Sequence, residues 1–153
     1  MKQYEILEHK ADLKIRAFGK TKEELFLNMM RGMISGLRPE ILKQPYGESQ
    51  ATAEAEKRNI EIKSPDLEAL LVDFLSEVLY LTQVNKEIYI DIKFKKLTDP
   101  STDSISSRRA ELEGELIGQK VKRFSEDIKA VTYHGLKIEK INKIWEAVVL
   151  FDV

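Results

Sequence analysis

Hydrophobic residues repeat at helical spacing in only two segments of this chain, whereas elsewhere they alternate with polar residues. The first helical segment begins at the capping box Thr21–Glu24 and is predicted to stop near Gly36. The second begins with Ser64 as its N-cap and continues to Leu81. Two helices among several strands, without regular alternation of strand and helix, predict an α+β fold and disfavour a doubly wound one.

Alternating segments predict strands over residues 4–6, 13–17, 59–63, 88–94 and 110–116, and the end of the sequence adds two further strands over 132–141 and 145–151. The last two are predicted to form a hairpin that turns at Asn142 and Lys143, and polar loops are predicted over 98–107 and 39–48. The predicted order is ββαβαββββ, arranged in two layers with a largely antiparallel or mixed sheet. A length of 153 residues predicts a single domain over 1–153.

The composition excludes several classes of function. Because the chain has no cysteine, it cannot form disulfides or thiolate zinc sites. Its 25 Lys and Arg against 26 Asp and Glu give a net charge of -1, so strong direct binding to nucleic acid is not expected. No apolar run is long enough for a membrane helix, and the first residues do not resemble a signal peptide, so we expect a cytoplasmic protein. Common phosphate-binding loops and the GxSxG elbow are absent.

Carboxylates near the two ends of the sequence form the first candidate site. Asp12 starts an amphipathic strand, and Asp152 with the terminal carboxylate of Val153 ends the last strand. Neighbouring carboxylates repel each other unless a cation lies between them. We expect the start of the second strand to meet the end of the last strand, so that three hard oxygen donors converge, which suits Ca²⁺ or Mg²⁺ better than zinc. Spacing alone leaves two alternatives open, a turn aspartate that binds its own backbone and an ordinary edge strand with solvated acids.

Groups able to transfer protons gather around the start of the predicted hairpin. Glu126, Asp127, Lys129 and His134 lie near the start of one strand. The other histidine of the chain is His9, between the first two strands. A solvated polar face would show the same pattern, and a structural role in a turn is the alternative to a ligand role for His9.

Four motifs occur in order along the whole chain. They are residues 9–19 (HKADLKIRAFG), 21–26 (TKEELF), 66–75 (DLEALLVDFL) and 128–134 (IKAVTYH), and the sequence ends in Asp-Val. Together these motifs resemble those of the archease family. One departure is Lys10, which stands where the family usually has threonine, and a cation at that position would weaken a nearby metal site if it pointed toward it.

The resemblance implies a protein cofactor rather than an enzyme. Archeases assist an RtcB-type RNA ligase in tRNA splicing and RNA repair, because they promote its guanylylation and so permit multiple turnover. The family's metal site falls on Asp12, Asp152 and Val153, with Ca²⁺ as the expected cation and Mg²⁺ or Mn²⁺ as alternatives. Lys129 matches a position implicated in activation. Further candidates for contacts with the partner are Glu126, His9 and His134.

Two alternatives belong to other functional classes. A small metal-dependent hydrolase would hold its metal with Asp12 and Asp152 and use His134 as the base. A metal-free interaction module would instead dock an acidic helix face on a basic partner. The residues of that face are Asp66, Asp73 and Glu77.

Overall fold

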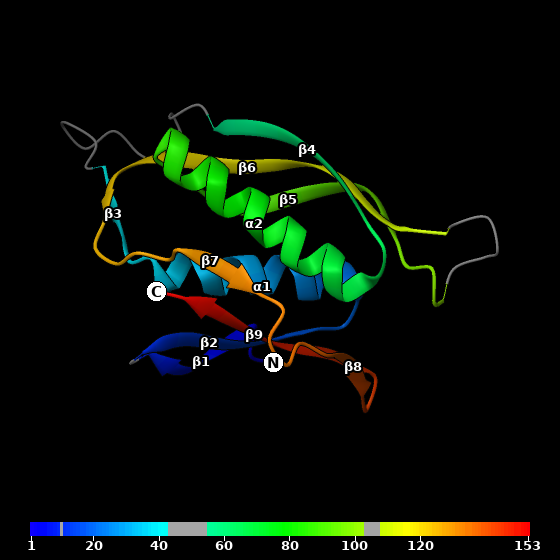
Figure 1. The fold of residues 1–153 in the computed structure, drawn as a ribbon. Helices are drawn as coiled ribbons and strands as arrows, with labels where there is room; N and C mark the ends of the chain where they lie inside the picture. The colour runs from blue at the N-terminus through cyan, green and yellow to red at the C-terminus, as the bar shows by residue number, and fades with distance from the viewer. Residues whose placement is uncertain (10, 43–54, 103–107) are drawn as a thin grey trace.

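The computed structural model describes residues 1–9, 11–42, 55–102 and 108–153, and it shows two helices packed against two sheets (Figure 1). Helix α1 (Lys22–Gly36) contacts strands of both sheets, whereas α2 (Leu67–Asn85) packs mainly on the second sheet. All strand pairs are antiparallel among the described residues, which confirms the predicted α+β class. Neither of these helices combines the length and apolarity needed to cross a membrane.

The first sheet contains both ends of the sequence. It consists of β1 (Tyr4–His9), β2 (Asp12–Gly19), β9 (Ile144–Asp152) and β7 (Ala130–Thr132) in that order, with β8 (Ile138–Ile141) also paired to β9. Strand β9 therefore lies in the middle of this sheet and pairs with β2, β7 and β8. This arrangement places the start of β2 directly beside the end of β9.

The second sheet is built around one long strand. It consists of β3 (Pro39–Ile41), β4 (Glu56–Ser64), β5 (Glu87–Thr98) and β6 (Ala110–Phe124). Strand β6 pairs with each of the other three, β3 at its end and β4 and β5 along its two sides. The described part of the chain thus forms two sheets, and β3 is a strand that the sequence did not predict.

Alternation along the strands separates a buried face of the first sheet from an exposed one. The inward side chains of β2 and β9 are fully or almost fully buried and belong to a single hydrophobic core shared with both helices, namely Leu13, Ile15, Ala17, Ala147, Val149 and Phe151. Because successive side chains of a strand point to opposite faces, Asp12 and Asp152 lie on the outer face. The core thereby fixes the orientation of both aspartates.

The helix caps agree with one prediction and correct another. The Thr21 hydroxyl accepts a hydrogen bond from the Glu24 N–H at 3.1 Å, as the capping box predicts. The N-cap of α2 is Asp66, whose carboxylate accepts from the Ala69 N–H at 2.8 Å, so the prediction of Ser64 is wrong. Ser64 is instead the last residue of β4.

The predicted C-terminal hairpin is present, but its first strand is broken. Asn142 and Lys143 have φ values of 49° and 68°, which is the backbone of a tight turn between β8 and β9. The segment 132–141 contains a break between Thr132 and Ile138, where Gly135 adopts a φ of 64°. A positive φ at this position interrupts the extended backbone, so one predicted strand becomes β7 and β8.

The two predicted loops are only partly described. Residues 39–41 form β3, which corrects the start of the first loop, and residues 43–48 lie outside the described part of the chain. Thr98 is the last residue of β5 rather than the first of a loop, and residues 103–107 are likewise not described.

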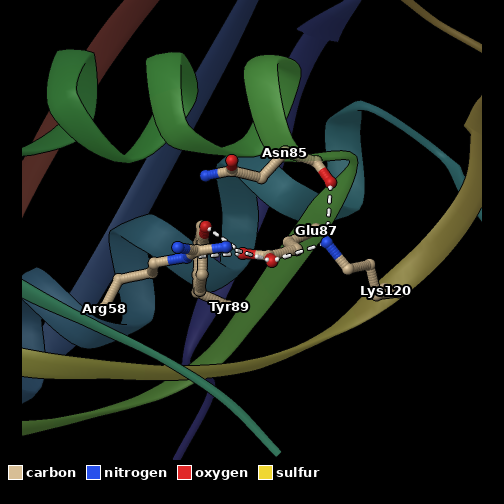
Figure 2. Close-up of polar contacts among 5 residues, drawn as sticks. All are labelled: Arg58, Asn85, Glu87, Tyr89 and Lys120. Carbon is tan, nitrogen blue, oxygen red and sulfur yellow. Dashed lines mark hydrogen bonds and ion pairs between the residues drawn. The ribbon is translucent and has the colours of Figure 1, made fainter.

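A buried carboxylate joins three strands of the second sheet (Figure 2). Glu87 of β5 is fully buried, and its oxygens accept hydrogen bonds from Arg58 Nε and Nη2 of β4 at 3.1 and 2.7 Å. Lys120 Nζ of β6 and the Tyr89 hydroxyl also donate to it, at 3.1 and 2.7 Å. The hydrogen bonds from Arg58, followed by those from Tyr89 and Lys120, lower the pKa of Glu87 to about 2. We call these four residues the Glu87 cluster.

Candidate functional site

Two carboxylates from opposite ends of the sequence meet at one end of the first sheet. Asp12 is the cross-strand partner of Asp152 in the pairing of β2 with β9. Residues directly opposite each other in an antiparallel pair project to the same face, with Cβ atoms about 4.5–5.5 Å apart. Asp12 is partly exposed and Asp152 is exposed. The predicted meeting of the second strand's start with the end of the last strand is confirmed.

The side chain of Val153 fixes the end of the last strand against the core. It follows Asp152 and is partly buried, packing against the hydrophobic core on the inner side of the sheet. The buried Phe151 precedes Asp152, so inward side chains flank this aspartate on both sides. Such anchoring restrains the backbone that carries the candidate oxygen donors.

The backbone of Lys129 lies beside Asp152 because its segment is fixed on several sides. Its backbone N–H donates to the Asp152 carbonyl at 2.7 Å, and Ala130 is the cross-strand partner of Asp152. Ile128 is fully buried, and its carbonyl accepts from Gln83 Nε2 of α2 at 2.9 Å. The Lys129 side chain itself is exposed, and its place next to Asp152 is fixed through the backbone.

The remaining candidates lie around this end of the sheet. Glu126 is exposed, and its N–H donates to the Leu37 carbonyl after α1 at 3.1 Å, three residues before Lys129. His9 is the last residue of β1, opposite Leu13, and its side chain is outside the described part of the structure, as is Lys10 altogether. Glu126 and Lys129 thus both lie in the segment between β6 and β7, whereas His9 is placed only by its backbone.

His134 approaches Asp12 through a groove on the outer face of the first sheet. The groove has a volume of about 530 Å³, and its lining includes Asp12, Lys14, Arg16 and His134. Arg16 Nη1 forms an ion pair with Glu5 at 3.1 Å. Lys14 and Arg16 were not among the predicted site residues, although alternation along β2 places them on the same face as Asp12.

The carboxylate pair fits a hard divalent cation only in part. Ca²⁺ takes about six to eight oxygen ligands, and Mg²⁺ takes oxygens together with several waters. Within the described residues, no three side chains of the His, Cys, Asp and Glu class gather closely enough to hold a metal. Asp12 and Asp152 would therefore need the Val153 carboxylate, water or groups of a partner to complete the coordination of such an ion.

A hydrogen-bonded chain ties the turn after β7 to α2. The Tyr133 hydroxyl donates to Asp73 Oδ1 at 3.1 Å, and the Ser64 hydroxyl donates to Asp73 Oδ2 at 2.6 Å. Burial, followed by the hydrogen bond to Asp73, raises the pKa of Tyr133. Asp73 thus accepts hydrogen bonds from both side chains while it remains partly exposed on α2.

Comparison with known sequences gives one consistent family. Residues 4–153 match the model of the Archease protein family (MTH1598/TM1083). The chain is 39% identical over 152 residues to the protein archease of Methanosarcina barkeri, covering 99% of this chain and 97% of that protein. It is 32% identical over 154 residues to the protein archease of Pyrococcus furiosus, and the alignment covers all of both chains.

Solved structures show the same fold. The solution structure of Methanobacterium thermoautotrophicum protein 1598 superposes with a TM-score of 0.71 at 28% identity over the full length of both chains. A crystal structure from Thermotoga maritima, described as an archease and possible chaperone, superposes with a TM-score of 0.61 at 21% identity, covering 97% of this chain and 96% of that one.

Proposed function

The chain belongs to the archease family, and from this membership we propose that it is a non-catalytic protein cofactor of an RtcB-type RNA ligase. It would promote guanylylation of the ligase and so allow multiple turnover in tRNA splicing and RNA repair in the cytoplasm. The observation that carries the proposal is the cross-strand pairing of Asp12 with Asp152 at the end of the first sheet.

A divalent cation is the proposed link between this site and the ligase. Asp12, Asp152 and the Val153 carboxylate would hold Ca²⁺, Mg²⁺ or Mn²⁺ through hard oxygen donors. Such a cation neutralises negative charge on phosphate groups when it is bound. With so few protein oxygens, coordination positions stay free for water or for groups of the partner. This incomplete shell suits a protein that presents an ion to another protein.

Lys129 has a separate proposed role beside the cation. Its side chain is exposed while its backbone is fixed to Asp152, so the ammonium group can reach outward without loss of position. A lysine acts toward phosphate or carboxylate as a point charge. We assign it to a contact with phosphate or with a ligase carboxylate, and Glu126, His9 and His134 to the surrounding contact area.

The test is a ligase guanylylation assay with and without this protein. We expect Asp12→Ala, Asp152→Ala and a chain extended by one residue after Val153 to lose stimulation, while Glu113→Ala, an exposed acid on β6, retains it. Calorimetric titration with Ca²⁺, Mg²⁺ and Mn²⁺ should show binding to the native chain and weaker binding to the Asp12 and Asp152 variants. Normal stimulation by all three altered proteins would refute the metal-site role.

One observation favours the hydrolase alternative. Asp12 and His134 line the same groove, as a metal ligand and a general base of a small hydrolase would. Turnover of a phosphoester by the isolated protein, lost in both Asp12→Asn and His134→Ala, would establish that function. If the isolated protein shows no turnover and still stimulates the ligase, the hydrolase function is rejected and the cofactor function is retained.

A further inference from the structure

The exposed side of α2 carries apolar side chains that the proposed function does not use. Tyr80 and Val84 are 58% and 61% exposed, although both are large hydrophobic residues. They are four residues apart and therefore lie on the same face of the helix. Figure 1 shows α2 on the near side of the molecule, where no other described element covers it. Adjacent exposed apolar side chains of this kind are typical of protein contact surfaces.

The charge on the same helix selects the kind of partner. Helix α2 has 19 residues and contains no lysine or arginine, whereas Glu68, Asp73 and Glu77 are partly exposed on it. A negative surface repels the phosphates of nucleic acid and attracts lysine and arginine. The partner that fits is therefore a protein surface with an apolar depression bordered by basic side chains.

This surface continues toward the candidate site. Tyr133, which is 56% exposed, donates its hydroxyl hydrogen bond to Asp73 of α2, and Gln83 of α2 binds the Ile128 carbonyl. Strand β7 lies beside α2 on the side where the chain ends (Figure 1). We define the α2 patch as Asp73, Glu77, Tyr80, Val84 and Tyr133. The segment 128–133 connects this patch directly to Lys129 and Asp152.

We infer that the α2 patch is the surface on which the partner protein docks. Tyr80 and Val84 fill the apolar depression, Glu77 faces the basic border, and Tyr133 extends the contact toward the first sheet. A partner seated there covers the end of that sheet and brings its own groups to Lys129 and Asp152. The inference rests on the proposed function for the identity of the partner, the RtcB-type ligase.

The test is direct binding of the full chain to the purified ligase, measured by calorimetry at two salt concentrations. We expect the double variant Tyr80→Ser/Val84→Ser to bind about tenfold or more weakly, because aromatic and apolar anchors dominate interface affinity. Glu77→Lys should also bind more weakly, with the difference shrinking at higher salt as the charges are screened. Both variants should keep the native melting temperature and the native affinity for Ca²⁺.

Two matched controls separate the patch from general surface effects. Ile141→Ser removes a side chain that is 46% exposed on β8, and Glu113→Lys reverses an exposed acid on β6. Both should bind the ligase as the native chain does. Equal binding by the native chain and the α2 variants would overturn the docking surface and leave the proposed function standing. Equal weakening by the controls would overturn it too, and failure of the native chain to bind would overturn both.

Discussion

Replacing Glu87 by glutamine should destabilise the fold by an amount set by the Glu87 cluster. The folded-state pKa of about 2 lies roughly 2 units below the ordinary glutamate value of about 4.3. At 1.36 kcal/mol per unit, the cluster contributes on the order of 3 kcal/mol at neutral pH. Arg58 and Lys120 are 37% and 50% exposed, so solvent screens part of their interaction with Glu87. We therefore expect Glu87→Gln to lower the free energy of unfolding by about 2–3 kcal/mol.

The pH dependence follows from the direction of the pKa shift. Because the folded-state pKa of Glu87 is lowered, its stabilising contribution is complete above the unfolded value of about 4.3. It is lost as the pH falls from that value through about 2, the folded pKa. The free energy of unfolding, obtained from urea titrations between pH 7 and pH 2, should therefore differ most between native and Glu87→Gln chains at neutral pH and converge in acid.

The control is Glu113→Gln, which removes an exposed carboxylate from the neighbouring strand. It should change the free energy of unfolding by less than about 0.5 kcal/mol at every pH. For a chain of this size the Glu87→Gln loss corresponds to a fall in melting temperature of about 5–10 °C. A difference between native and Glu87→Gln chains that stays constant from pH 7 to pH 2 would refute the electrostatic account.

Three further substitutions test other features of the fold, each by thermal or urea unfolding. Gly118→Ala should destabilise by about 3 kcal/mol or more, because a Cβ there would lie 2.0 Å from the Ile88 carbonyl oxygen, and an unchanged stability would contradict the described approach of β5 to β6. Asp66→Ala should cost about 1 kcal/mol through loss of the α2 cap, whereas Ser64→Ala should act instead through Asp73. Lys143→Gly should stabilise by about 0.5–1 kcal/mol, since its φ of 68° suits glycine, and destabilisation would exclude that turn.

The face of a strand could be predicted where its residues alternate, whereas its partner strand could not. Alternation along 13–17 already places Asp12 opposite to the buried side chains, but residues 147–151 are all apolar and leave the face of Asp152 open. That these two residues are paired depends on contacts between segments at opposite ends of the chain, which no local pattern encodes. For this site, the chemistry of the carboxylates suggested that Asp12 and Asp152 lie together, the family resemblance named the same residues, and the register of β2 with β9 shows that they are paired.

Local sequence patterns gave a wrong helix start where two residues could both serve as the N-cap. Ser64 and Asp66 are both good N-caps, and only the pairing of Ser64 with Ala110 in the second sheet removes Ser64 from the helix. The apolar residues also change from odd-numbered to even-numbered positions at Gly135, from Val131 and Tyr133 to Leu136 and Ile138. This change and the glycine itself were the local signals for the break between β7 and β8, and the prediction of one strand over 132–141 overlooked them.

The Glu87 cluster lies beyond what any sequence pattern shows. Arg58, Glu87 and Lys120 are residue types that usually remain solvated, and they come from three separate segments. Only the register that sets Glu87 opposite Lys120 turns them into a buried network. The exposure of Tyr80 and Val84 could not be predicted either, because helical periodicity does not tell which apolar residues lack a covering element.

The central position of β9 sets an order of events during synthesis on the ribosome. Every strand of the second sheet lies within residues 39–124, so that sheet can form while the ribosome still holds the last strand. The first sheet has to wait, since β2 has no neighbour on one side until residues 144–152 emerge. In the meantime one backbone edge of β2 stays unpaired, next to the apolar side chains of Leu13, Ile15 and Ala17. A chain that stalled before residues 144–152 emerged would therefore be prone to aggregate.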